Sequence, residues 1–366
     1  MKTTFDIQYA SKPQKAIGFI EATQNKKPLF VLTIATTETA KIQGISAAGQ
    51  NPEFTDYTPA ADAELLLLGK CKSIDGVPIT PDGIPTPALI AMSALRLADI
   101  PVLVASGGLK VKPKIPYFDL GGNPGRDIKT GNAVDNVSEV IERTKLAGEQ
   151  LAKTAEYLVI GESIPGGTTT ALGLLSAMGI NAQGKVSSSM PENPHGLKGD
   201  VVRAGLAAAG EKFGSLKDNP VRAISCVGDP MMAAFAGLVL GAAGGVPVLM
   251  AGGTQMTAVL AVVKALDADV LCNVAIGTTR WVVNDSSSNI RGIVSQIADV
   301  PILAADLDFS ASRFSGLQAY EKGIVKEGVG AGGAAIASMT ASGGTVTKHM
   351  LLREIERSYA LLMGTK

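Results

Sequence analysis

The sequence predicts an α/β fold in which a mostly parallel, Rossmann-like sheet is flanked by helices. Two observations support this fold class. Short apolar runs alternate with helical patterns through most of the 366 residues, and several runs end in glycine. Sheets of this kind bind ligands in the crevice beyond the carboxyl ends of their strands. We therefore expect the glycine-rich loops of this chain to lie at its binding site.

The predicted strands are short runs of apolar and β-branched residues, such as "PLFVLTIA" and "VPILAAD". They occupy residues 28–35, 100–107, 157–162, 221–228, 246–252, 269–277 and 300–306. The segments between them repeat apolar residues at helical spacing. These predicted helices occupy residues 134–156, 168–179, 196–213, 254–266 and 287–298.

Residues 230–263 contain no charge, over a stretch longer than the ~20 apolar residues that a membrane-spanning helix needs. Pairs of glycines interrupt it. "PMMAAFAGLVLGAAGG" is typical of a helix stopped by two glycines, "VPVLMAGG" of a short strand, and "TQMTAVLAVVKAL" of a second helix. Because buried β-α units in parallel sheets have such continuous apolar sequence, we expect no membrane insertion.

The two ends of the chain differ from this middle part. "QKAIGFIEATQ" and "TVTKHMLLREIERSYALLM" predict helices without strand partners, the second with Leu351, Ile355 and Tyr359 on one face. We expect residues 1–26 and 341–366 to form a small helical subdomain beside an α/β domain of residues 27–340.

Composition excludes several classes of function. Lys plus Arg and Asp plus Glu each number 33, so no charge excess favours nucleic acid or an anionic membrane, and a small molecule is the default ligand. The histidines, His195 and His349, have no partner at metal-ligand spacing, so we expect no metal site. The start, "MKTTFDIQYASKPQK", lacks the apolar segment of a signal peptide, which predicts a cytoplasmic protein.

The loop "GESIPGGTTT", residues 161–170, lies between a predicted strand and a predicted helix. Its spacing, G-x-x-x-x-G-G-T, is that of a phosphate-binding P-loop with glycine in place of the lysine. The amides of Gly166, Gly167 and Thr168 at a helix N-terminus would bind an anion without a cation, helped by the hydroxyls of Thr168 and Thr169. The alternative is a plain turn whose threonines cap the helix. The absent lysine disfavours ATP hydrolysis, whereas a monophosphate demands less.

A second glycine-rich element, "KEGVGAGGAA", places a carboxylate beside residues small enough for a ligand to approach the backbone. At the mouth of an apolar pocket, Glu327 would have a raised pKa and suit a general base. The alternative is a solvated carboxylate favoured by the dipole of the following helix. Lys198, in "HGLKGDVVRAGL", either faces solvent or reaches a ligand phosphate.

Three further candidates stand where predicted strands end. Gly228 and Gly252 end two predicted strands, and Ser310 follows the last one. Each is either a place where a ligand contacts the backbone or an ordinary loop residue.

Taken together, these segments resemble the nicotinate-nucleotide:dimethylbenzimidazole phosphoribosyltransferase family of cobamide biosynthesis. "GESIPGGTT" is similar to the family's G-E-M-G-I-G-N-T-T, "CVGDPMMAAFAGLVLGAAGGVPVLMAGG" to its G-G-x-x-x-A-G-x-A-G segment and the next strand, and "SAS" to its S-A-E. "KEGVGA" is similar to its G-E-G-T-G-A, which implies that Glu327 is the catalytic base. The resemblance covers roughly residues 120–340, and the N-terminal part looks like the archaeal and cyanobacterial branch. Gly167, Ala251 and Ser312 depart from the family's asparagine, aspartate and glutamate.

The resemblance implies transfer of phosphoribose from nicotinate mononucleotide to dimethylbenzimidazole, another benzimidazole or adenine, by a homodimer without a cofactor. Glu162 would orient the ribose hydroxyls or support the loop. The residues that would hold the phosphate or complete the binding site are Gly166, Gly167, Thr168, Thr169, Lys198, Gly228, Gly252, Ser310 and Gly328. Two other functions stay open, namely a nucleotide-dependent kinase or ATPase with a degenerate P-loop, and a non-catalytic nucleotide-binding accessory protein.

Overall fold

The computed structural model describes residues 5–48, 51–76, 78–80, 83–188, 190 and 192–364. Over these residues, eight strands form one sheet in the order β1-β8-β7-β6-β5-β2-β3-β4. The strands are β1 (Ile7–Ser11), β2 (Pro28–Ala35), β3 (Val102–Gly108), β4 (Phe118–Asp119), β5 (Tyr157–Ser163), β6 (Val248–Ala251), β7 (Val274–Thr279) and β8 (Ile302–Ala305). All pairs are parallel except β1 with β8. The predicted α/β fold with a mostly parallel sheet is therefore confirmed.

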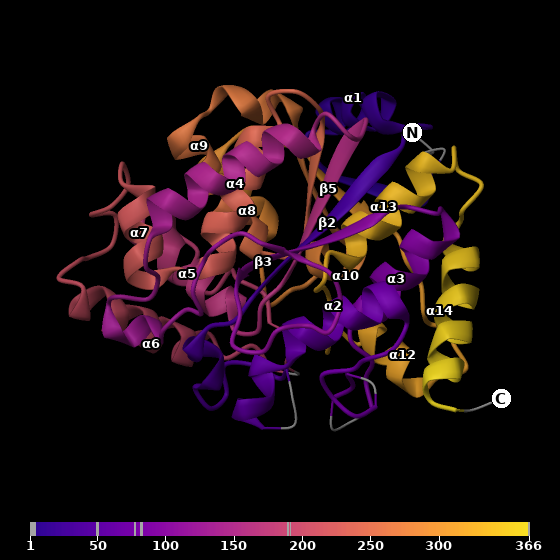
Figure 1. Cartoon of the computed structure of the whole chain (residues 1–366), viewed down its shortest axis with the longest axis horizontal. Helices are drawn as coiled ribbons and strands as arrows, with labels where there is room; N and C mark the ends of the chain where they lie inside the picture. The colour runs from indigo at the N-terminus through magenta and orange to yellow at the C-terminus, as the bar shows by residue number, and fades with distance from the viewer. Residues whose placement is uncertain are drawn as a thin grey trace.

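Helices cover both faces of the sheet (Figure 1). One face carries α4 (Val137–Leu151), α5 (Gly167–Ala177), α6 (His195–Ala208), α7 (Pro220–Val227), α8 (Pro230–Ala242), α9 (Gln255–Leu266) and α11 (Ile290–Ile297). The other carries α1 (Pro13–Thr23), α2 (Thr58–Leu68), α3 (Ala88–Leu97), α12 (Ser315–Glu321), α13 (Ala331–Ala341) and α14 (Lys348–Leu362). Short helices are α10 (Arg280–Val283) and the 3₁₀ turns Glu38–Lys41, Pro52–Asp56, Ile128–Thr130 and Asp269–Asn273. Because strand side chains alternate, β2 sends Phe30 and Leu32 to one core and Val31 to the other.

The order of the strands reverses between β2 and β5. After β2 the chain continues to β3 and β4 on one side, and then returns to β5 on the opposite side of β2 before it continues through β6, β7 and β8. The connections that leave the carboxyl ends of β2 and β5 therefore run apart. A parallel sheet has its ligand-binding crevice at such a point.

One predicted strand is wrong, because residues 221–228 lie mainly in helix α7. Pro220 stands in the first turn of the helix, where its missing N–H is tolerated, and the Asn219 side chain accepts a hydrogen bond of 3.0 Å from the Arg222 amide. The buried face of the helix consists of Ala223, Ile224, Cys226 and Val227. A short apolar run does not distinguish a strand from a buried helix, and here the Asn-Pro start decides for the helix. Gly228 therefore follows a helix and not a strand.

The uncharged stretch of residues 230–263 folds as α8, β6 and α9, as expected. None of the helices that the structure describes is both long and apolar enough to span a bilayer. The predicted strand at 269–277 begins instead as a 3₁₀ turn, and β7 starts only at Val274.

The ends of the chain join the main body of the fold. The expectation that the N-terminal segment has no strand partner is wrong, because β1 pairs antiparallel with β8, with Ile7 opposite Ala305. The two expected terminal helices are present as α1 and α14. Helix α1 packs against β1 and α13, whereas α14 packs against α3, and both contribute to the same core. The domain boundaries proposed at residues 27 and 340 stay a prediction.

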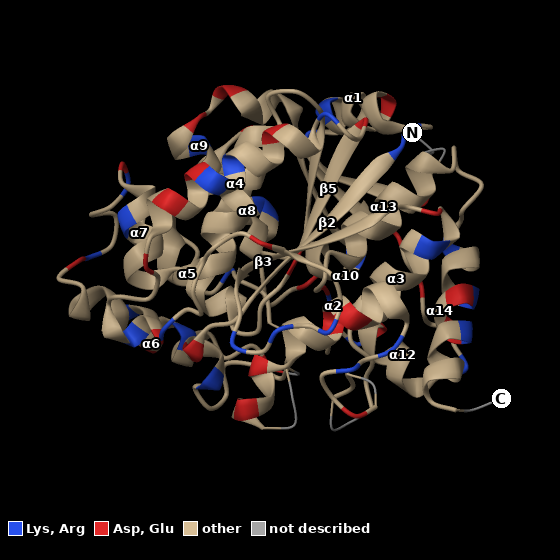
Figure 2. Ribbon diagram, viewed as in Figure 1, with Lys and Arg blue, Asp and Glu red and all other residues tan. Residues whose placement is uncertain are grey.

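Charged side chains of both signs are mixed on the outer helices (Figure 2). On α4, Arg143 pairs with Glu139 one turn away, and on α14, Arg357 pairs with Glu354.

Candidate active site

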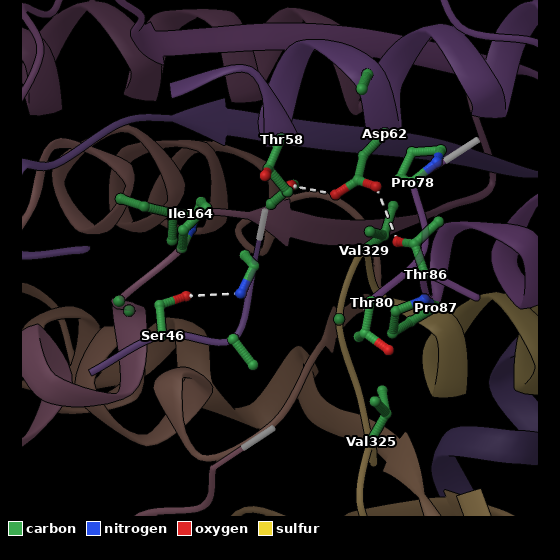
Figure 3. A pocket seen from close by; sticks show the side chains of 18 of the residues that line it. Ser46, Thr58, Asp62, Pro78, Thr80, Thr86, Pro87, Ile164, Val325 and Val329 are labelled. Carbon is green, nitrogen blue, oxygen red and sulfur yellow. Dashed lines mark hydrogen bonds between the residues drawn. The ribbon is translucent and has the colours of Figure 1, made fainter. Parts of the chain in front are cut away.

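A cavity of about 250 Å³ lies at the crevice between the carboxyl ends of β2 and β5 (Figure 3). Its walls come from residues 45–48 after β2, from α2 and the segment before α3, from residues 162–168 at the end of β5, and from residues 325 and 327–329 before α13. Among the described residues that line it, none is Lys, Arg or His. The carboxylates in the lining are those of Asp62, Asp75, Glu162 and Glu327.

The loop after β5 forms one wall. Gly166 has a φ of +79°, and a Cβ at this position would lie 3.0 Å from the Ala40 Cα, so any other residue would be strained and crowded. Helix α5 starts directly after it at Gly167, and no side chain caps its first amides. Gly166, Gly167 and Thr168 line the cavity, whereas Thr169 is buried outside the lining with its hydroxyl unpaired in the described part of the chain. The wall is therefore suited to an anion, through backbone amides and the helix dipole.

Glu327 reaches the same cavity from the segment that precedes α13. Its carboxylate accepts hydrogen bonds from the amides of Gly328 at 3.1 Å and Gly332 at 3.2 Å, and it lies 3.4 Å from the Thr278 hydroxyl. Burial nevertheless raises its pKa to about 7, because the loss of solvent outweighs the backbone donors. Gly328, with a φ of +154°, also lines the cavity. A carboxylate that is half ionised near neutral pH suits general-base chemistry.

Glu162 is buried near the end of β5. It accepts from the Ile164 amide at 3.2 Å and from the Gln255 side chain at 3.5 Å. Burial raises its pKa well above the ordinary range, and the charges of Asp229 and Glu327 raise it further. An ionised Glu327 therefore disfavours ionisation of Glu162.

Asp62, on α2, is a third buried carboxylate in the cavity and was not found by the sequence analysis. It accepts hydrogen bonds of 2.8 Å from the hydroxyls of Ser163 and Thr86 (Figure 3). Burial raises its pKa to about 6, although both hydroxyls act in the opposite direction. A signal was available, because "TPAADAELLLL" places two acids in an otherwise apolar helix. The other acid, Glu64, accepts backbone N–H groups at Lys72, Ser73 and Lys114 and does not line the cavity.

Lys198 is buried and faces neither solvent nor the cavity lining directly. Its Nζ donates to the Ser187 carbonyl at 2.7 Å and to the Asn193 side chain at 3.1 Å. Burial lowers its pKa to about 7, and the positive charge of Lys326 lowers it further. Lys326 is buried nearby, with its Nζ 3.0 Å from Asp285 and 3.3 Å from the Ser188 carbonyl. The two lysines thus lie behind residues 187 and 188, of which Ser188 lines the cavity.

The structure does not bring the remaining predicted residues into the cavity lining. Gly228 precedes Asp229, which caps α8 and accepts from the Thr170 hydroxyl at 2.5 Å, so this segment supports the loop after β5 from behind. Gly252 is buried after β6, with its amide bonded to the Gly277 carbonyl at 3.0 Å. Ser310 is exposed, and its amide bonds to the Asp308 carboxylate at 3.0 Å.

Comparison with known proteins places the chain in a family. A family model described as phosphoribosyltransferase matches residues 95–278, which is half of the chain. The chain therefore belongs to this phosphoribosyltransferase family, as the motif resemblance implied. Its relatives include the UPF0284 protein of Sulfolobus acidocaldarius, which is 47% identical over 91% of this chain and 95% of the relative. The UPF0284 protein of Pyrococcus furiosus is also 47% identical, over 92% of this chain and 100% of the relative.

Two solved structures from Thermus thermophilus share the fold. One is a nicotinate-nucleotide-dimethylbenzimidazole phosphoribosyltransferase, with a TM-score of 0.56 and 17% identity over 97% of this chain and 92% of that one. The other is described as CobT, with a TM-score of 0.58 and 18% identity over 98% and 96%. At this identity the likeness concerns the fold.

Proposed function

We propose that this protein transfers phosphoribose from nicotinate mononucleotide to a benzimidazole or purine base, giving an α-ribazole-type phosphate and nicotinate for cobamide nucleotide-loop assembly. One observation carries the proposal: Glu327, with a pKa of about 7, shares a cavity with the uncapped N-terminus of α5. The reaction needs one base and one site for a monophosphate, and this cavity offers both.

The phosphate of the donor would bind where Gly166, Gly167 and Thr168 line the cavity, because the dipole of a helix N-terminus that no side chain caps favours a dianion. The positive charge of Lys198, which lies behind residues 187 and 188, would add electrostatic attraction for the phosphate. Binding of a phosphate would raise the pKa of this lysine from about 7 and keep it charged. The ribose would then lie toward Glu162, which would orient its hydroxyls.

The chemistry would be a single displacement at the ribose C1′. A ring nitrogen of the acceptor attacks C1′ as the bond to the pyridinium nitrogen breaks, and the bonding pair leaves with nicotinate. The leaving ring becomes neutral, so it needs no proton. Glu327 takes the N–H proton of the attacking ring, and the ring, which became cationic on bonding to C1′, is neutral again. Attack from the face opposite the leaving group converts a β-riboside into an α-nucleotide, and the shared cavity supplies positioning.

The test is to mix purified protein with nicotinate mononucleotide and a panel of bases, and to follow nicotinate and the new nucleotide by mass spectrometry. We expect equal amounts of both products with at least one base. Folded protein that forms no product with any base would refute the transferase proposal. Tight ATP binding with magnesium-dependent turnover would then favour a kinase or ATPase. Nucleotide binding without turnover, unaffected by Glu327→Gln, would favour an accessory protein.

The quaternary structure and cellular location form part of the same proposal. We propose a cytoplasmic homodimer that uses small-molecule substrates and no cofactor. Sedimentation at several protein concentrations tests the dimer, for which a mass of one chain throughout is the contradicting result.

A further inference from the structure

The cavity carries a carboxyl group that the proposed reaction itself does not use. Asp62 lies on α2, is 3% exposed, and lines the cavity between the loop after β5 and the segment before α3. The displacement needs Glu327 as its base and leaves Asp62 without a chemical role. A buried carboxylate is costly unless it is compensated, so its presence calls for a function.

Asp62 has unused capacity to accept hydrogen bonds. One oxygen accepts from the Ser163 hydroxyl and the other from the Thr86 hydroxyl, each at 2.8 Å. A carboxylate offers about four acceptor positions, so two remain beyond the hydrogen bonds that the described residues make. Glu64 on the same helix differs, because its donors are three backbone amides and a hydroxyl, and it lies outside the cavity lining.

The surroundings of Asp62 suit a flat heterocycle. Val329, Pro78 and Pro87 line the same cavity as Asp62 and Thr86 (Figure 3). The apolar and proline side chains form a wall that a ring can stack against. Pro87 also approaches Gly328, the neighbour of the proposed base, since a Cβ on this glycine would lie 3.3 Å from the proline ring. The wall therefore runs from Asp62 to the residue beside Glu327.

Asp62 and Glu327 line the same cavity, and the buried ring of Tyr320 senses both charges. Tyr320 is buried and donates to the Pro85 carbonyl at 2.8 Å. Burial raises the pKa of Tyr320 well above its ordinary value, and the negative charges of Glu327 and Asp62 raise it further. A heterocycle whose reacting nitrogen faces Glu327 thus has Asp62 within the same site.

We propose that Asp62 selects the acceptor, so that the preferred bases carry a neutral hydrogen-bond donor, an amino or hydroxyl group, on the ring edge away from the reacting nitrogen. This inference rests on the proposed function and names its acceptor class. A donor-bearing base fills a free acceptor position of Asp62. A methyl-bearing base such as dimethylbenzimidazole leaves the carboxylate desolvated and uncompensated.

The experiment compares 5-aminobenzimidazole with 5-methylbenzimidazole, which are close in shape and differ in the donor. The measured quantity is the ratio of their kcat/KM values in nicotinate release. We expect the wild type to favour the amino base by about tenfold or more, as for a hydrogen bond to a charged group. We expect Asp62→Asn to reduce this ratio several-fold and Asp62→Leu to favour the methyl base.

Ser163→Ala is the matched control, because it removes a partner of Asp62 and leaves the carboxylate in place. If Asp62 only holds α2 against β5, Ser163→Ala and Asp62→Asn will lower the kcat/KM of both bases alike and leave the ratio unchanged. That result overturns the inference, as does a wild type that prefers the methyl base. If no base yields product, the proposed function fails. Calorimetry then still tests the inference, through the ratio of the Kd values of the two benzimidazoles for the wild type and for Asp62→Asn.

Discussion

Replacing Glu327 by glutamine is expected to stabilise the fold at pH 8 and to have little effect at pH 5. On folding, the pKa of Glu327 rises from the ordinary 4.5 to about 7, because burial penalises the carboxylate more than its amide donors favour it. The unfolded chain therefore loses this proton at a lower pH than the folded chain. Folding stability falls as pH rises from about 4.5 to about 7, and the loss stays constant above that.

The size of the effect follows from the two pKa values. A shift of one pKa unit between the unfolded and folded states corresponds to about 1.36 kcal/mol. The unfavourable contribution of Glu327 is then under about 1 kcal/mol at pH 5 and about 3 kcal/mol at pH 8. Glutamine keeps the shape and an oxygen that accepts from the Gly332 amide, but it cannot ionise. For a chain of this length, a gain of about 3 kcal/mol raises Tm by several degrees.

The assay is thermal unfolding by circular dichroism, at pH 5 and pH 8 for Glu327→Gln and at pH 4 and pH 8 for its control. Glu64→Gln is the matched control, because Glu64 is a buried carboxylate whose backbone donors lower its pKa instead. A lowered pKa adds stability above the ordinary value that is lost as pH falls, so Glu64→Gln is expected to destabilise more at pH 8 than at pH 4. A Glu327→Gln variant that loses Tm equally at both pH values would refute the reasoning.

Three further predictions concern the reaction. The kcat/KM for nicotinate release is expected to rise with pH through about 7 as Glu327 ionises. Glu327→Gln is expected to lower kcat by about 10²- to 10⁴-fold and to remove this rise with pH. A variant with the wild-type pH profile would exclude Glu327 as the base. Gly166→Ala is expected to lower the free energy of unfolding by about 1–3 kcal/mol in urea and to raise KM for nicotinate mononucleotide. Gly210→Ala is the control, because Gly210 is also at positive φ but in open space. It should lose only the stability that backbone strain costs, and its KM should be unchanged. Lys198→Met is expected to raise KM for the phosphorylated donor most below pH 7, where the lysine is charged, and an effect independent of pH would argue against a charge contribution.

The sequence sufficed for the fold class and for the main wall of the cavity. Alternation of apolar runs with helices predicted the parallel sheet, because buried strands leave a strong apolar pattern. Gly166 and Gly167 were predicted at the cavity because a strand, a glycine turn and a helix follow one another directly. Glu327 was placed there by its glycine-rich surroundings and by resemblance.

Features that depend on tertiary contacts were missed. The run at 221–228 is apolar enough for a strand, and only the Asn219 cap and Pro220 distinguish it as a helix. β1 is recognised only through its pairing with β8, nearly three hundred residues away in the chain. Asp62 was missed because an acid in an apolar helix is ordinarily turned to solvent, whereas here Ser163 and Thr86 bind it inside the protein.

The most direct test of the account is the configuration and stoichiometry of the product formed from nicotinate mononucleotide and a benzimidazole. Proton NMR of the purified nucleotide reports the anomer, and chromatography counts the nicotinate released. We expect one α-nucleotide per nicotinate with the wild type, and a rate at least about a hundredfold lower with Glu327→Gln. A β-nucleotide, or nicotinate released without any nucleotide, would contradict a single displacement in this cavity.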